Sequence, residues 1–97
     1  MHRIVIDQTK VRIDEQLIRR GATPFPRPLE WWQRTLPIWV TASEGIDGTV
    51  ILEPNGKVAN GRQRKLTPTV LRQEMKAIRS YLASRTHLDF SDALIEA

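Results

Sequence analysis

The segment over residues 67–85 constrains the fold of this chain more than any other. Four apolar residues recur in it at intervals of four, three and four positions, namely Leu71, Met75, Ile78 and Leu82. This spacing aligns them along one side of an α-helix. Thr67 suits the N-cap position, and Pro68 suits the first turn, where an amide hydrogen is not needed. The sequence therefore predicts a long amphipathic helix over about residues 67–85, whose apolar side must pack against another element.

A small antiparallel sheet is the predicted partner of this helix. Residues 38–42 and 49–53 are rich in β-branched and apolar side chains, and the residues between them have the composition of a loop. The sequence Pro54-Asn55-Gly56 favours a hairpin turn, because Asn and Gly tolerate positive φ angles. We therefore expect the second strand to pair with residues 57–60, which gives a three-stranded antiparallel meander over about residues 38–60. Together with the helix, this meander predicts an α+β fold.

Short elements are expected on the N-terminal side of the sheet. Residues 3–6 and 10–13 alternate in polarity and predict two strands, joined either as a hairpin or as one long bent strand. These strands either extend the sheet or pair with a second copy of the chain. Asp14 is predicted to cap a short helix that Gly21 terminates, with Leu17 and Ile18 facing the core.

A proline-rich segment and a second short helix precede the sheet. Three prolines within residues 23–28 predict a stiff extended segment, which leads into a helix that begins near Pro28 and ends before Pro37. Trp32 has the apolar spacing of a core residue. Trp31 points about 100° away from it and is the tryptophan expected to be most exposed. At the other end of the chain, residues 88–97 predict an acidic C-terminal helix or tail.

The size and composition of the chain exclude several classes of site. Its 97 residues are expected to form a single small domain over residues 1–97, with a homodimer as one way to gain stability. The absence of cysteine excludes disulfides, thiolate zinc sites and cysteine nucleophiles. The two histidines, His2 and His87, have no reason to meet, and we expect no catalytic, cofactor or metal site and no enzymatic activity. No apolar run approaches the ~20 residues of a membrane span, so a cytoplasmic location is the default expectation.

Positive charge is concentrated in one part of the sequence. The formal net charge is +4, but residues 1–56 carry seven cations and seven acids, and residues 86–97 carry three acids and no cation. Residues 57–85 carry eight cations and one acid, Glu74. A field of one sign destabilises a folded chain unless anions compensate it. The distribution therefore predicts a basic hairpin-helix face over residues 57–85 that is matched by some source of negative charge.

Three sources of that negative charge remain open at this point. The phosphates of DNA or RNA are one, because Lys and Arg gain free energy by releasing the counterions of a nucleic acid. The acidic surface of a partner protein is the second. The third is the C-terminal segment of the same chain, which carries Asp89, Asp92 and Glu96.

The leading hypothesis is a small non-enzymatic regulator that binds nucleic acid or a nucleoprotein complex mainly through phosphate contacts. The alternative is a small inhibitor, antitoxin-like or adaptor protein that binds an acidic protein surface, with Trp31 and the proline-rich segment as its apolar anchor. The residues predicted to contact either partner are Lys57, Arg62, Gln63, Arg64, Lys65, Arg72, Lys76, Arg79 and Trp31.

Overall fold

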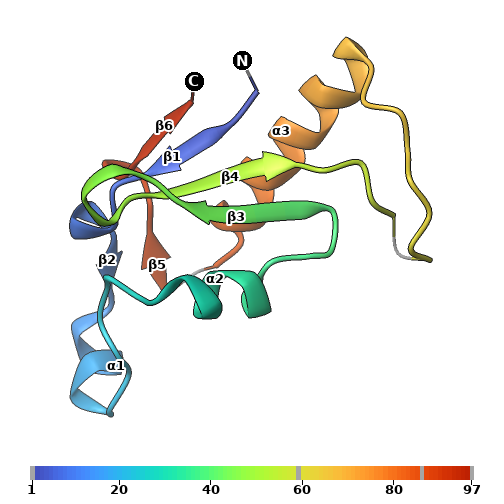
Figure 1. The fold of residues 1–97 in the computed structure, drawn as a ribbon. Coiled ribbons are helices and arrows are strands. Elements are labelled where there is room, and N and C mark those ends of the chain that lie inside the picture. Colours follow the sequence, from blue (N-terminus) through green and yellow to red (C-terminus); the bar gives the residue numbers. More distant parts are fainter. Residues whose placement is uncertain (1, 59, 86, 97) are drawn as a thin grey trace.

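A four-stranded antiparallel sheet forms the centre of the molecule (Figure 1). The computed structural model describes residues 2–58, 60–85 and 87–96. The strands lie in the order β3, β4, β1 and β6, and they span Val40–Glu44, Val50–Pro54, Ile4–Ile6 and Leu94–Glu96. A separate two-stranded sheet pairs β2 (Arg12–Ile13) with β5 (Leu88–Asp89). The chain is thus an α+β protein with an antiparallel sheet and one long helix, as its sequence predicts.

Three helices begin and end at the signals that the sequence carries. Helix α1 (Glu15–Arg19) begins after Asp14, whose carboxylate accepts a 2.8 Å hydrogen bond from the backbone of Gln16. Helix α2 (Leu29–Thr35) follows Pro28 and ends two residues before Pro37. Helix α3 (Pro68–Ala83) begins after Thr67, whose hydroxyl accepts a 3.2 Å hydrogen bond from the amide of Val70. The side chains of Asp14 and Thr67 each satisfy an amide that the first helical turn leaves free, whereas α2 has no side-chain cap.

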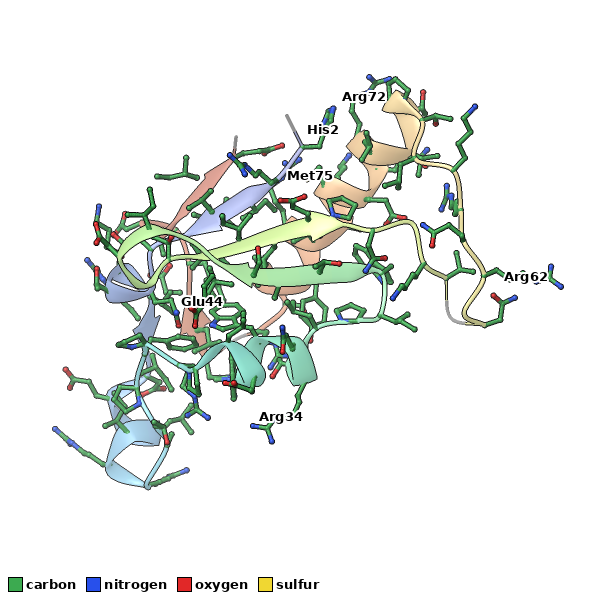
Figure 2. All side chains as sticks on the ribbon, viewed as in Figure 1. His2, Arg34, Glu44, Arg62, Arg72 and Met75 are labelled. Atoms are coloured by element: carbon green, nitrogen blue, oxygen red, sulfur yellow. The ribbon has the colours of Figure 1, made fainter. Side chains whose placement is uncertain are left out.

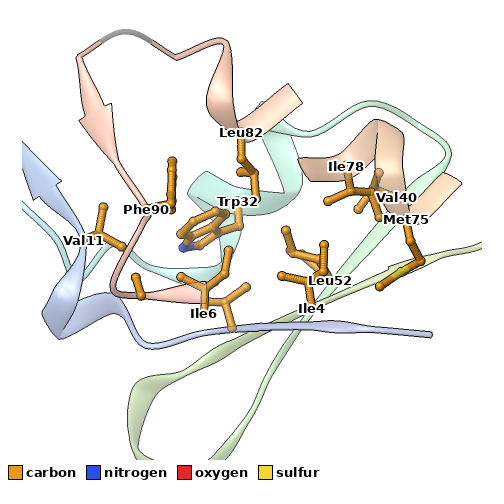
Figure 3. Packing of buried hydrophobic residues seen from close by; sticks show 13 residues of the cluster. Ile4, Ile6, Val11, Trp32, Val40, Leu52, Met75, Ile78, Leu82 and Phe90 are labelled. Atoms are coloured by element: carbon orange, nitrogen blue, oxygen red, sulfur yellow. The ribbon is translucent and has the colours of Figure 1, made fainter. Parts of the chain in front are cut away.

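The core lies between one face of the sheet and the helices α2 and α3. Trp32 of α2 is only 1% exposed, and Met75, Ile78 and Leu82 of α3 are buried, whereas Leu71 is half-buried. Figure 3 shows these side chains meeting strand residues and Phe90 in one cluster. The strand residues of this cluster are Ile4, Ile6, Val40, Ala42, Val50 and Leu52. The register places them on one face, because Ile4 lies opposite Leu52, which in turn lies opposite Ala42.

The predicted turn at Asn55-Gly56 does not form a hairpin between β4 and residues 57–60. The edge of β4 that this strand was expected to occupy is taken by β1, whose Val5 lies opposite Ile51. The prediction of a third meander strand is therefore wrong. The sheet is completed instead by β1 and β6, from the two ends of the chain. The two N-terminal strands extend two different sheets and are joined by a 3-10 turn over Gln8–Lys10, so they form neither a hairpin nor one long strand.

Two further expectations are wrong in this structure. Of the two forms expected for the C-terminal segment, a helix or a tail, the helix is wrong, because the described residues form β5, a turn and β6, with Leu94 paired to Ile6 and Ile95 to Val5. Helix α1 contributes no buried residue: Leu17 is half-buried, and Ile18 is 38% exposed rather than facing the core. A five-residue helix has too short an apolar stripe to pack against the sheet.

Candidate functional site

The segment between β4 and α3, residues 55–67, carries most of the predicted contact residues, and we call it the basic loop. In Figure 1 it runs out beyond the end of β4 and returns to the start of α3. Its first residue is tied to the start of β3: the amide of Asn55 donates to the carbonyl of Trp39 at 3.0 Å, and its side chain donates to Ile38 and to Thr41 at 2.9 Å. The loop therefore begins at a fixed point of the sheet.

The two halves of the basic loop are held together by backbone pairing. Lys57 and Gln63 form an isolated antiparallel bridge, the amide of Arg64 donates to the carbonyl of Gly56 at 2.6 Å, and that of Val58 donates to Arg62 at 3.0 Å. Gly61, with a φ of +82°, lies in the turn at the outer end of the loop. The sequence predicts a hairpin turn at Asn55-Gly56. In the structure the turn lies instead at the second Asn-Gly pair, Asn60-Gly61.

Three cations of the basic loop are exposed and have no counterion among the residues that the structure describes. Lys57, Arg62 and Lys65 are exposed, and none of them forms an ion pair with a carboxylate of the described residues. Figure 2 shows Arg62 at the outer end of the loop, directed away from the sheet. These three side chains are therefore free to meet an external anion.

Two other predicted residues of the loop are occupied within the chain. The guanidinium of Arg64 lies 3.8 Å from the carboxylate of Glu74 on α3, and the side chain of Glu74 is only 13% exposed. The side-chain amide of Gln63 donates to the backbone carbonyl of Asn55 at 2.7 Å. Arg64 thus has its charge partly compensated, and Gln63 uses its donor to close the loop.

Two cations of α3 are exposed to solvent, and a third forms an ion pair with a residue of the sheet. Arg72 and Lys76 are exposed and form no ion pair with the described residues. Figure 2 shows Arg72 near the start of α3, where the basic loop joins the helix. Arg79, one turn beyond Lys76, is half-buried and pairs with Glu96 of β6. Lys57, Arg62, Lys65, Arg72 and Lys76 therefore form the unneutralised part of the predicted surface, and we call these five the free cations.

Trp31 lies apart from the free cations. It is half-buried on α2, and its ring makes edge-to-face contacts with Phe25 at 5.4 Å and with Trp32 at 5.1 Å between ring centroids. The guanidinium of Arg27 lies 5.2 Å from its centroid. Trp31 is thus not part of the basic surface. Its ring packs against Phe25 and Arg27 of the proline-rich segment.

The acidic C-terminal residues do not lie over the free cations. Glu96 pairs with Arg79, whereas Asp92 lies 3.3 Å from Arg12 of β2. Asp89 accepts hydrogen bonds from the hydroxyl and the amide of Ser91, which lower the pKa of its carboxyl. The compensating acid that sequence reasoning passed over is Glu74. Its signal was its position as the single acid among the cations of residues 57–85.

The described residues add no other chemistry to this surface. No three side chains of His, Asp or Glu within residues 2–58, 60–85 and 87–96 are placed to bind a metal ion together. Among the helices described, none has the length and apolar character of a membrane-spanning segment. No family model, curated protein or solved structure matches this chain.

Proposed function

We propose that this protein is a small non-enzymatic regulator that binds nucleic acid, alone or within a nucleoprotein complex, through phosphate contacts of its basic loop. The observation that carries the proposal is the set of three exposed cations, Lys57, Arg62 and Lys65, on a projecting loop, with no ion pair to a carboxylate of the described residues. Phosphates are the anions that such a surface neutralises with the largest gain from counterion release.

Helix α3 extends this surface beyond the loop. Arg72 and Lys76 add two positive charges on the exposed side of the helix, directly after the point where the loop joins it. A nucleic acid carries a row of phosphates and can contact the basic loop and α3 at the same time. Its binding free energy then has a contribution from all five free cations. An isolated small anion gains from only one or two of them.

The expected binding mode is positioning on the backbone rather than reading of bases. Gln63 uses its amide donor within the loop, and the side-chain carbonyl of Asn60 accepts a 3.0 Å hydrogen bond from the amide of Arg62. These are the two side chains of the loop best suited to base edges, and each already uses one of its two polar atoms within the loop. We therefore expect affinity that depends weakly on sequence and strongly on salt.

The test is a binding titration with labelled duplex DNA, single-stranded DNA and single-stranded RNA at two salt concentrations. A variant with Lys57, Arg62 and Lys65 all changed to Gln is expected to lose about tenfold or more in affinity at low salt. Its salt dependence should fall by about one unit of slope for each cation removed. The comparison of the three oligonucleotides identifies the class of nucleic acid.

A matched variant controls for net charge. The control variant has Arg19, Arg20 and Arg34 changed to Gln, so it also loses three positive charges. All three residues are exposed and lie outside the basic loop: Arg19 in α1, Arg20 directly after α1, and Arg34 in α2. The control variant should bind as the wild type does to within about threefold. If both variants lose the same affinity for the oligonucleotides, binding depends on net charge alone and not on the basic loop. If the wild type leaves all three oligonucleotides unbound at low salt, the proposal fails, and an acidic protein surface becomes the partner to search for with the same two variants.

A further inference from the structure

A surface groove lies on the opposite side of the molecule from the basic loop, and its lining differs from that of the basic surface. It encloses about 360 Å³ between α1, the proline-rich segment, α2 and β5. Its walls are mainly apolar and include Leu17, Phe25, Trp31 and Leu88, with Arg27 as the one Lys, Arg, Asp or Glu side chain that lines it. This size and this lining are typical of a binding site for a ligand with an apolar group and one charge.

The wall of the groove is held in place by the core. Phe25 lies in edge-to-face contact with Trp31 at 5.4 Å between centroids and packs against Trp32 at 5.8 Å. The amide of Arg27 donates to the buried side-chain carbonyl of Gln8 at 2.8 Å. The groove is therefore formed before any ligand arrives, which lowers the conformational cost of binding.

Arg27 is the charged Lys, Arg, Asp or Glu side chain of the groove, and Thr23 and His87 are its other polar lining residues. Its guanidinium lies over the ring of Trp31, 5.2 Å from the centroid, and its Nε is buried without a hydrogen-bond partner. Among the described residues no carboxylate forms an ion pair with it. A partly buried cation with an unmet donor is costly, and a planar guanidinium fork matches the two oxygens of a carboxylate.

We propose that this groove binds an acidic peptide segment of a partner protein, with a carboxylate on Arg27 and a neighbouring large apolar side chain between Phe25, Trp31 and Leu17. The charge of the site supports a negatively charged group on the ligand, because Arg27 is the one Lys, Arg, Asp or Glu side chain that lines the groove. The form of the site supports a chain rather than an enclosed small molecule, since α1 forms one wall and none of its residues is buried. This site shares no residue with the basic loop and does not depend on its proposed function.

The experiment uses ¹⁵N-labelled protein and a capped peptide, acetyl-Ala-Phe-Glu-Ala-amide, with the Glu→Gln peptide as its neutral counterpart. We expect saturable shifts of the Trp31 indole N–H and the Arg27 Nε–H resonances, with about tenfold tighter binding of the acidic peptide. The Trp32 indole N–H should shift little, because it is already bonded to Gln8. Equal affinity for the two peptides, or no shift of Trp31 at about 10 mM peptide, would overturn the proposal.

Two variants locate the interaction without relying on the loss of the fold. Arg27→Gln should remove the preference for the acidic peptide, and Arg27→Lys should keep only part of it, because an ammonium lacks the planar fork. Arg34→Gln, an exposed position elsewhere on α2, should leave the preference unchanged. If Arg34→Gln lowers the preference as much as Arg27→Gln does, Arg27 is not the binding group. If 3-phenylpropionate binds as tightly as the peptide, the site takes free carboxylic acids and the assignment to a peptide is wrong.

Discussion

The side-chain carbonyl of Gln8 accepts a hydrogen bond of 3.0 Å from the indole N–H of Trp32 in the centre of the molecule. The same oxygen accepts from the amide of Arg27 at 2.8 Å, and the side-chain amide of Gln8 donates to the carbonyl of Gly48 at 3.0 Å. Gln8 is 5% exposed and is the one buried polar or charged residue of the described core. It thereby ties together the turn after β1, the proline-rich segment, α2 and the loop between β3 and β4.

Replacing Gln8 should destabilise the fold more than its side-chain size suggests. Gln8→Ala removes the partner of three groups at once, including the indole of the largest core residue, and buried polar groups without partners are costly. We expect a loss of about 3 kcal/mol in the free energy of unfolding, measured by urea denaturation. Gln16→Ala, an exposed glutamine of α1, should change it by less than about 0.5 kcal/mol. Equal effects of the two substitutions would show that the contacts of Gln8 contribute nothing net.

The two Asn-Gly pairs of the basic loop should respond differently to alanine. A Cβ at Gly56 would lie 2.5 Å from the carbonyl oxygen of Arg64, and its φ of +78° disfavours a side chain as well. At Gly61 the φ is +82°, but a Cβ would meet no atom of the described residues within 4 Å. We therefore expect a cost of about 1 kcal/mol for Gly61→Ala and about 3 kcal/mol for Gly56→Ala, measured by thermal unfolding. A larger cost at Gly61 would contradict this closure of the loop.

Glu74 should weaken polyanion binding in the wild type. It lies 3.8 Å from Arg64 and lowers the positive potential beside the free cations. Glu74→Gln should tighten oligonucleotide binding about two- to fivefold at low salt, with a change in the free energy of unfolding below about 1 kcal/mol. Glu30→Gln makes the same change of net charge on α2 and should have a smaller effect. Equal tightening by both variants would assign the effect to net charge alone.

The carboxyl of Asp7 offers a test of local geometry by pH. The hydroxyl of Thr9 donates to it at 2.7 Å and the amide of Thr9 at 3.1 Å, and these hydrogen bonds hold the pKa of Asp7 below its ordinary value of 3.8. A lowered folded-state pKa contributes stability that is present above pH 3.8 and is lost as the pH falls through the lower value. Thr9→Val should raise the pKa of Asp7 toward 3.8 in an NMR titration of side-chain carboxyl carbons. The pKa of Asp89, bonded to Ser91, serves as the internal reference and should not move.

Local signals in the sequence predicted the helices and part of the sheet. Thr67, Pro68 and the apolar spacing that follows specify α3, because caps and helical periodicity act within a few residues of each other. Asp14 and Gly21 specify α1 in the same way, and Gly21 has a left-handed φ of +97°, which is common just after the last turn of a helix. The pattern of charge likewise located the free cations, since exposed Lys and Arg need no particular tertiary partner.

The neighbours of each strand were decided only by the tertiary structure. Asn55-Gly56 and Asn60-Gly61 are equivalent turn signals to local reasoning, and both glycines adopt positive φ. Which of them closes a hairpin depends on β1, which pairs with β4 and buries Ile4 and Ile6, and β6 from the other end of the chain pairs with β1 in turn. Such pairings gain their free energy from apolar surface buried between residues far apart in sequence, which no local pattern encodes.

The candidate sites likewise combine features that local sequence predicts with contacts between residues far apart in the chain. The long amphipathic helix, the surplus of positive charge in residues 57–85 and the lack of cysteine chemistry follow from the residue pattern alone. The ion pairs Glu74–Arg64 and Glu96–Arg79 depend on the fold, as does the lack of an ion pair to Lys57, Arg62 and Lys65 among the described residues. The reason is physical: a side chain's charge is a property of the residue, whereas its compensation depends on which distant residue the fold brings within a few ångströms.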